Sequence, residues 1–225
     1  MSSKLTVHEP MRPTRRTMVR SAAWSVPVVA VAATAPAYAA SCGNAETLSW
    51  SNYTDGTVFS SAMFGSTKLT LSQSGNLGSD SGKVLYQDEG GVNPALRFYP
   101  TNGVDGSSIT VTLTFSRAVK NLSFTILDID NANNGNGSTA WRDRIAVTGT
   151  PSSVSVGSRI QGAGTENSPY RSSGTTQIDN SDPDGNVTLT WNGPLTSVTY
   201  RYFQIGAPTG TPHTGLSNIS FTTIC

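Results

Sequence analysis

The residues best suited to chemistry in this 225-residue sequence are carboxylates gathered around one polar loop. Asp128 and Asp130 end an apolar alternating stretch, Asn131 follows, and Asp143 lies beyond the loop 131–142. If the flanking segments pair as strands across this loop, the three carboxylates meet at one rim of the fold. Like charges buried there are costly unless a cation neutralises them, and Ca²⁺ accepts six to eight oxygen ligands. The spacing therefore predicts a calcium site at these four residues.

The same segment also permits an interpretation without a metal ion. Ala132 stands where an EF-hand loop has its fifth-position ligand, so the segment departs from that pattern. The aspartates would then cap turns of a solvated hairpin, or Arg142 or Arg144 would pair with one of them. Both interpretations stay open on the sequence alone.

A second acidic loop, residues 179–186, favours a turn over a metal site. Asparagine and aspartate alternate ahead of a glycine, as in the first half of a calcium loop, but Trp191 stands where the closing glutamate would be. The sequence Pro183-Asp184-Gly185 is a strong signal for a tight turn.

Aromatic residues near the polar loops suggest a second kind of site. We expect Trp141 and Tyr170 to lie in or beside loops, where aromatic rings stack on sugars in carbohydrate-binding modules. The alternative is that both rings cover the edge of the fold. The predicted partner is accordingly an extracellular or cell-surface ligand, with a glycan as one candidate.

Catalytic motifs are absent from the sequence, and no catalytic residue is predicted. His213 is the only histidine after residue 40, so zinc has no second histidine there. Asp88 and Glu89 are adjacent and would point to opposite faces of a strand, unlike the paired acids of glycosidases. No Gly-x-Ser-x-Gly or His-Glu-x-x-His pattern occurs. A secreted hydrolase that acts on polysaccharide, built from scattered aspartates, remains the enzyme alternative.

The elements that must position these residues follow from hydrophobic patterning. After residue 40, apolar and polar residues alternate with the period of half-buried strands. The clearest stretches are residues 109–115, 122–126, 187–191, 198–202 and 219–221, with weaker candidates at 46–50, 67–73, 83–87, 95–100, 143–148 and 153–156. Glycine-containing turn signals separate them, and none has a helical period. The pattern predicts an all-β fold, a two-sheet antiparallel β-sandwich of jelly-roll-like or immunoglobulin-like form.

The first 39 residues predict an export signal. Arg15 and Arg16 precede an apolar run, and Ala37 and Ala39 supply the small side chains that signal peptidase requires. Paired arginines ahead of a weakly hydrophobic run are typical of twin-arginine export. The stretch RRTMVRSAAWSVPVVAVAATAPAYA resembles twin-arginine leaders of secreted proteins from high-GC Gram-positive bacteria. We expect a signal peptide over 1–39, one domain over 40–225, and a secreted or envelope-associated protein.

The two cysteines flank the expected domain. Cys42 lies near its start and Cys225 is the last residue printed. In an exported protein this arrangement predicts a disulfide between them.

The charge and composition of the chain exclude several classes of protein and partner. Residues 1–39 carry five basic side chains and one acidic one, whereas residues 40–225 carry ten basic and thirteen acidic ones. Charged residues make up 13% of the chain, which argues against a coiled coil, a disordered acidic tail or a nucleic-acid binder. The leader's apolar run of about 14 residues is shorter than the roughly 20 that span a bilayer, and no span is predicted after it.

Two stretches resemble a recurring pattern in secreted bacterial β-sandwich modules of uncharacterised surface and adhesin-like proteins. These are FTILDID at 124–130 followed by DRIAV at 143–147, and GNVTLTW at 185–191 followed by the segments 193–200 and 215–221. The likeness covers roughly residues 107–225. It implies a β-sandwich with an extracellular role, calcium at Asp128 and Asp130, and no enzymatic activity. We therefore expect an exported, non-catalytic binding or structural module.

Overall fold

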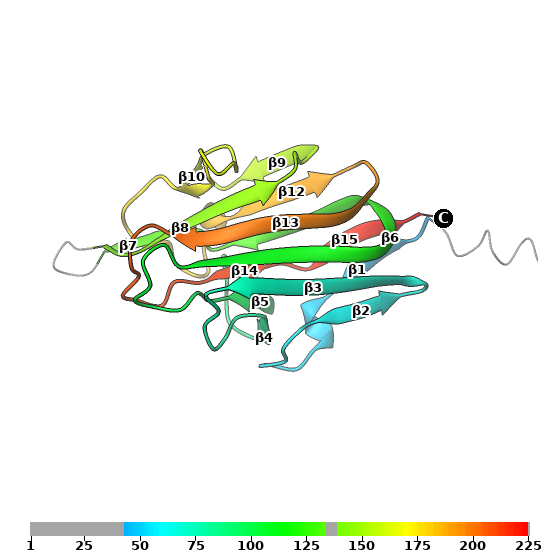
Figure 1. The fold of residues 1–225 in the computed structure, drawn as a ribbon, viewed down its shortest axis with the longest axis horizontal. Coiled ribbons are helices and arrows are strands. Elements are labelled where there is room, and N and C mark those ends of the chain that lie inside the picture. Colours follow the sequence, from blue (N-terminus) through cyan, green and yellow to red (C-terminus); the bar gives the residue numbers. More distant parts are fainter. Residues whose placement is uncertain (1–42, 134–138, 225) are drawn as a thin grey trace, which may run out of the picture. The chain divides into compact units, whose positions relative to one another are not determined.

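The computed structural model describes residues 43–133 and 139–224, and the fold over these residues is antiparallel β-structure without an α-helix (Figure 1). The strands are β1 (Ala45–Leu48), β2 (Ser61–Phe64), β3 (Thr67–Gly75), β4 (Lys83–Leu85), β5 (Ala95–Phe98), β6 (Ser108–Leu127), β7 (Asn131–Asn133), β8 (Thr139–Thr148), β9 (Ser153–Val156), β10 (Ile160–Gln161), β11 (Arg171–Ser172), β12 (Val187–Trp191), β13 (Leu195–Gln204), β14 (Thr214–Leu216) and β15 (Ile219–Thr223). Two 3-10 turns, η1 (Trp50–Asn52) and η2 (Pro183–Gly185), complete the elements. Every alternating stretch in the sequence overlaps a strand, so the all-β prediction is confirmed.

Strand β6 organises the fold because its two halves pair with different neighbours. Its first half lies between β3 and β13, and its second half pairs with β12, β14 and β15. The sequence predicted two strands, at 109–115 and 122–126, whereas the structure joins them into one strand of 20 residues. Buried residues are odd-numbered from Ile109 to Val119 and even-numbered from Leu122 to Ile126, and Leu127 at the end of the strand is buried as well. Asn121, at φ 51°, inserts the extra residue that switches the pattern.

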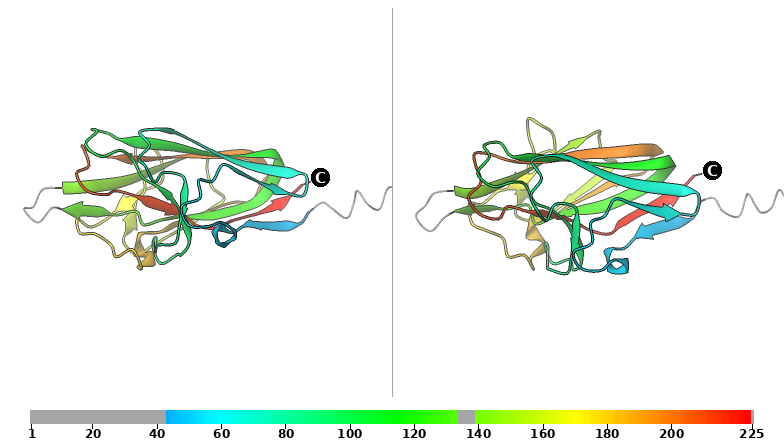
Figure 2. Two further views of the ribbon diagram at one scale, coloured as in Figure 1. Left: turned by 90° about the horizontal axis from the view of Figure 1, so that it is seen from below. Right: turned by 60° about the horizontal axis from the view of Figure 1, so that its bottom comes forward.

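The core lies on the concave side of this bent sheet, which curls into a half-barrel (Figure 2). Phe115, Phe124 and Trp191 are 2%, 2% and 7% exposed. Tyr200 packs against both Phe98 and Phe124, with ring centroids 6.0 and 6.4 Å apart. Large apolar residues from both halves of β6 therefore share one core, which is the physical reason for the alternation in the sequence.

The short strand β14 brings distant segments together at the end of β6. It lies between β5 and β6, with Leu216 opposite Leu96 and Gly215 opposite Leu127. The chain preceding β14 therefore lies beside the chain leaving β6 and the chain leaving β5. The turn ahead of β5 packs over β14, where Glu89 lies against Gly215.

Several sequence-based predictions fall on residues that the structure does not describe. They are the leader residues Arg15, Arg16, Ala37 and Ala39, the proposed 1–39 boundary, and the cysteines Cys42 and Cys225. Within the described ranges, no helix is long and apolar enough to cross a membrane.

Candidate metal centre

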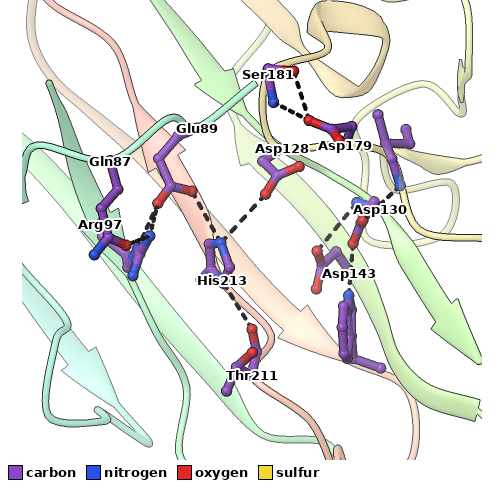
Figure 3. A network of polar contacts seen from close by, with 12 residues as sticks. Gln87, Glu89, Arg97, Asp128, Asp130, Asp143, Asp179, Ser181, Thr211 and His213 are labelled. Atoms are coloured by element: carbon purple, nitrogen blue, oxygen red, sulfur yellow. Dashed lines mark hydrogen bonds and ion pairs between the residues drawn. The ribbon is translucent and has the colours of Figure 1, made fainter. Parts of the chain in front are cut away.

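Three side chains from separate segments converge where β6 ends (Figure 3). Glu89, Asp128 and His213 each offer one ligand atom, and these atoms all lie within 4.8 Å of one another. The Nε2 atom of His213 is 3.3 Å from Oε2 of Glu89 and 3.5 Å from Oδ2 of Asp128. Asp128 directly follows β6, His213 directly precedes β14, and Glu89 lies in the turn before β5. Pairing of β14 with β6 thus brings His213 beside Asp128, and the turn before β5 brings Glu89 against β14.

A glycine in β14 makes room for the glutamate. A Cβ atom at Gly215 would lie 2.8 Å from Cβ of Glu89, closer than real Cβ contacts. The glutamate therefore lies directly against the backbone of β14. Its other carboxylate oxygen, Oε1, accepts a hydrogen bond from Nε of Arg97 at 2.6 Å and also contacts the Nη2 atom of that arginine. These contacts fix the side chain and leave Oε2 facing the histidine.

The imidazole of His213 is oriented by the chain beside it. Its Nδ1 atom lies 2.7 Å from the carbonyl oxygen of Thr211 (Figure 3). Because a carbonyl only accepts, Nδ1 carries the proton and donates it, and in the neutral ring the Nε2 lone pair then faces the two carboxylates. A backbone acceptor on the far nitrogen is the usual arrangement of a metal-binding histidine.

Burial makes this cluster energetically unusual. Glu89 is 0% exposed, Asp128 is 3% exposed, and the side chain of His213 is 13% exposed. Among the described residues, Oε2 of Glu89, Oδ1 of Asp128 and Nε2 of His213 have no hydrogen-bond partner. Leaving a buried polar atom unpartnered costs about 1–3 kcal/mol, and more when the group is charged. The three groups therefore need a cation between them, or a proton shared with the imidazole.

The electrostatics at Asp128 lead to the same conclusion. Burial is the largest cause that raises the pKa of its carboxyl group to about 8, and the charges of Asp130 and Glu89 contribute to the same shift against the lowering effect of Arg97. Asp128 also has a left-handed backbone, at φ 60°, which is uncommon for residues other than glycine. A bound cation would offset both the burial of this carboxylate and its repulsion from Glu89.

The donor set distinguishes between metal ions. Two carboxylates and one imidazole suit Zn²⁺, which accepts nitrogen and oxygen ligands and is often held by three protein groups. Ca²⁺ prefers a shell made of oxygen alone. The cluster therefore favours a transition metal over the calcium ion predicted from the sequence.

The structure places the four predicted calcium ligands in different environments. Asp128 joins Glu89 and His213, whereas Asp130 and Asp143 form a separate buried pair beside them (Figure 3). Asn131 belongs to neither group, because its Oδ1 atom accepts a hydrogen bond from Nη1 of Arg144 at 3.1 Å.

The Asp130–Asp143 pair has protein donors for its carboxylate oxygens. The two oxygens of Asp130 accept hydrogen bonds from Nε1 of Trp141 at 2.7 Å and from the backbone of Ile178 at 3.0 Å. In Asp143, Oδ1 accepts from Tyr202 at 2.8 Å and from Gln204 at 2.6 Å. Its Oδ2 atom accepts from the backbone N–H of residue 130 at 3.2 Å. The pair is thus held by the protein itself.

Burial raises the pKa of Asp143 well above its usual range, and the neighbouring charge of Asp130 raises it further. Hydrogen bonds from Gln204 and Tyr202 oppose this shift. Asp143 is 0% exposed, so the solvated hairpin considered in the sequence analysis does not describe its surroundings.

The two aromatic residues predicted to bind sugars lie against the fold. Tyr170 is 4% exposed and belongs to the core. Trp141 is half-buried, and a Cβ atom at Gly210 would lie 2.4 Å from its ring, so the chain covers part of that ring. Stacking on sugars gains no support from either position.

The second acidic loop forms the predicted turn. Residues Pro183–Gly185 make the 3-10 turn η2, and Oδ1 of Asp182 accepts a hydrogen bond from the backbone N–H of Asp184 at 2.9 Å. The side chain of Asp182 thus caps this turn.

Comparison with known proteins gives no assignment: no protein-family model matches the chain, and no curated protein matches its sequence. The functional argument therefore depends on the site. Sequence reasoning considered Glu89 and His213 separately and assigned neither to a site. The signal that could have linked them was their scarcity, since a single histidine and three glutamates follow residue 40.

Proposed function

We propose that this protein is an exported, non-catalytic binding module that holds a zinc ion at Glu89, Asp128 and His213. The observation that carries the proposal is the convergence of one ligand atom from each of three side chains at the end of β6, where each side chain also has a buried polar atom without a hydrogen-bond partner. We further propose that the strands on either side of the β6 bend form the two layers of a β-sandwich, as the resemblance to secreted bacterial modules implies.

The metal ion would cross-link three segments that are distant in the sequence. The turn before β5 provides Glu89, the end of β6 provides Asp128, and the segment before β14 provides His213. The side chain of Asn186 already connects two of these segments, since it accepts a hydrogen bond from the N–H of Asp128 at 3.1 Å and donates to the carbonyl of Gly90 at 2.8 Å. A metal ion at this junction would stabilise the folded state in proportion to its binding free energy.

A binding role fits the burial of the cluster better than catalysis does. Two of the three proposed ligands are no more than 3% exposed, so a substrate has little access to an ion between them. The polysaccharide hydrolase considered in the sequence analysis would need an open cleft with two acids beside the scissile bond. We expect the zinc-loaded protein to hydrolyse no polysaccharide at a rate above that of the buffer.

Titration of the chelator-treated protein with metal ions tests the proposal. We expect one Zn²⁺ to bind per chain by calorimetry and to raise the melting temperature, with Ca²⁺ giving a much smaller rise. His213→Ala should abolish both zinc effects. Glu166→Gln is the matched control, because Glu166 is an exposed acid paired with Arg201 at 2.6 Å and should leave zinc binding unchanged.

Two results would contradict this proposal. If saturating zinc leaves the melting temperature unchanged while His213→Ala lowers it, the histidine acts as a protonated partner of the two carboxylates and no metal is needed. If Ca²⁺ stabilises the protein and His213→Ala has no effect on that, the ion binds elsewhere.

Export and a terminal disulfide belong to the same proposal. Strands β1 and β15 pair with Ala45 opposite Thr222, and the N–H of Thr223 donates to the carbonyl of Asn44 at 3.0 Å. Asn44 and Thr223, which lie two residues along the chain from Cys42 and Cys225, are therefore hydrogen-bonded neighbours, and this supports the proposed disulfide.

Such a bond would close a loop of about 180 residues and contribute roughly 5 kcal/mol in the chain-entropy model. We expect secreted protein to resist alkylation until it is reduced, and reduction to lower its melting temperature. The variant Cys42→Ser should melt at the reduced temperature with or without reductant. Free thiols in the secreted protein would contradict the disulfide and leave the zinc proposal intact.

A further inference from the structure

A pocket away from the proposed zinc ligands lies among β7, β8, β10 and β11, and none of those ligands lines it. Its volume is about 250 Å³. Three arginines line it, Arg142 and Arg144 from β8 and Arg171 from β11. Residues with hydroxyl or amide side chains and one glycine complete the described lining: Asn131, Asn133, Gln161, Ser172, Ser173, Gly174 and Thr175. No acidic side chain of the described residues belongs to it.

This concentration of positive charge contrasts with the rest of the domain. Residues 40–225 hold ten basic and thirteen acidic side chains, so the region is acidic overall. Three of those ten basic side chains nevertheless line one pocket. A fourth, Arg159, lies beside the pocket wall, because a Cβ atom at Gly174 would be 3.4 Å from its Nη2 atom. Like charges gathered in this way repel one another unless an anion is bound between them.

The electrostatic cost of gathering these arginines is clearest at Arg144. It is only 8% exposed, and burial lowers the pKa of its guanidinium. The carboxylate of Asp143 opposes that shift, whereas the charges of Arg171 and Arg142 add to it. A buried guanidinium beside two others is costly in the free protein, and part of that cost would be recovered when an anion binds.

Hydrogen bonds hold two of the arginines in place without neutralising them. Nη1 of Arg144 donates to Oδ1 of Asn131 at 3.1 Å and to the carbonyl of Asp143 at 2.6 Å. Nη1 of Arg171 donates to the carbonyl of Pro169 at 3.3 Å. Within residues 43–133 and 139–224, neither arginine forms an ion pair with a carboxylate, and their Nε and Nη2 groups remain available to a ligand. Two such groups on one guanidinium match the paired oxygens of a phosphate or carboxylate.

We infer that this pocket binds the oxyanion group of an acidic extracellular ligand, a phosphate or a sugar carboxylate, through Arg144 and Arg171. Its volume is small beside the 300–1,000 Å³ usual for complete ligands, so it accommodates one charged group or one sugar unit of a larger molecule. The neutral hydroxyls and amides of the lining supply further hydrogen bonds to such a group.

Titrations with inorganic phosphate and with sodium glucuronate, at constant ionic strength and with chelator present, test this inference. We expect saturable changes in the NMR signals of the arginine Nε–H groups and of the backbone amide of Gly174. Arg171→Gln should weaken binding about tenfold or more, because one charge-assisted hydrogen bond is lost. Arg171→Lys, which keeps the charge but loses the paired donors, should weaken it less.

Arg117→Gln is the matched control, because Arg117 is an exposed arginine of β6 outside the pocket. It should leave binding unchanged, as should His213→Ala, which separates this inference from the zinc proposal. Stronger binding of phosphate or of glucuronate identifies the source of the oxyanion, and either result supports the site. The inference is overturned if neither anion gives saturable changes, or if Arg117→Gln weakens binding as much as Arg171→Gln does.

Discussion

Two groups of buried carboxylates lie next to each other in this protein, and they differ in what surrounds their oxygens. The Asp130–Asp143 pair receives hydrogen bonds from two side chains of β13, from an indole and from backbone N–H groups. In the neighbouring cluster, Glu89, Asp128 and His213 each have a buried side-chain atom without a hydrogen-bond partner in the described residues. Both groups are buried to a similar degree.

The difference shows that burial of an acid does not by itself indicate a binding site. A carboxylate whose oxygens all accept hydrogen bonds from the protein is part of the structure, and removing it leaves its donors unpaired. A buried carboxylate whose oxygens lack such donors needs a cation or a proton to offset the cost of its burial. The two groups should therefore respond in opposite ways to substitution.

Removing the well-bonded carboxylate should have the largest effect. Asp143→Ala leaves the hydroxyl of Tyr202 and the amide of Gln204 buried without their acceptor, and we expect a loss of about 3–5 kcal/mol in the free energy of unfolding. That loss corresponds to a fall of roughly 10 °C in the melting temperature. Asp105→Ala, at an exposed aspartate in a turn, serves as the control and should change stability by less than about 0.5 kcal/mol. Equal effects from both substitutions would show that the pair carries no special role.

The pH dependence of the chelated protein should show the raised pKa of the Asp143 carboxyl group. Below the ordinary pKa near 4, the folded and unfolded states both hold this proton. As pH rises towards the raised folded pKa, only the unfolded state releases it, so stability falls by up to about 1.4 kcal/mol per pH unit from this group.

Urea unfolding at several pH values between 4 and 8 measures this slope. Asp143→Asn should flatten it, although the variant is less stable at every pH. A stability that rises across this range, or a slope unaffected by the substitution, would argue against a proton retained at Asp143.

The smallest change in stability is expected at Asp128. Asparagine tolerates the left-handed backbone at φ 60° and removes a charge that repels Glu89. We therefore expect Asp128→Asn to alter the metal-free stability by less than about 1 kcal/mol, with a gain as the favoured sign. The same substitution should weaken zinc binding by more than about a hundredfold. A large loss of stability in the metal-free protein would show that Asp128 supports the fold as the Asp130–Asp143 pair does. The contrast between the two groups would then be wrong.

Alternation of side chains was sufficient to predict the strands and the all-β class. At β6 it predicted the buried residues of both halves but not that they form one strand with an extra residue at Asn121. Period-2 reasoning assigns faces correctly only while the strand is regular, and a bulge reverses the assignment of every later residue.

The acidic segment 128–143 was predicted from composition and local spacing, and its three aspartates are indeed buried near one another. Their division into two groups was not predictable. It depends on which donors approach from β13 and on the segments that provide Glu89 and His213, all of which are distant in the chain.

The sequence by itself determined the class of fold, the positions of most strands and turns, and the scarcity of residues able to do chemistry. These follow from local alternation and turn preferences, which act between neighbours along the chain. The tertiary structure alone decided which scarce residues meet. The pairing of β14 with β6, and the packing of the turn before β5 against β14, bring the single histidine after residue 40 to two carboxylates that lie 39 residues apart in the sequence. The arginine pocket has the same origin, because β8 and β11 are side by side only in the folded chain.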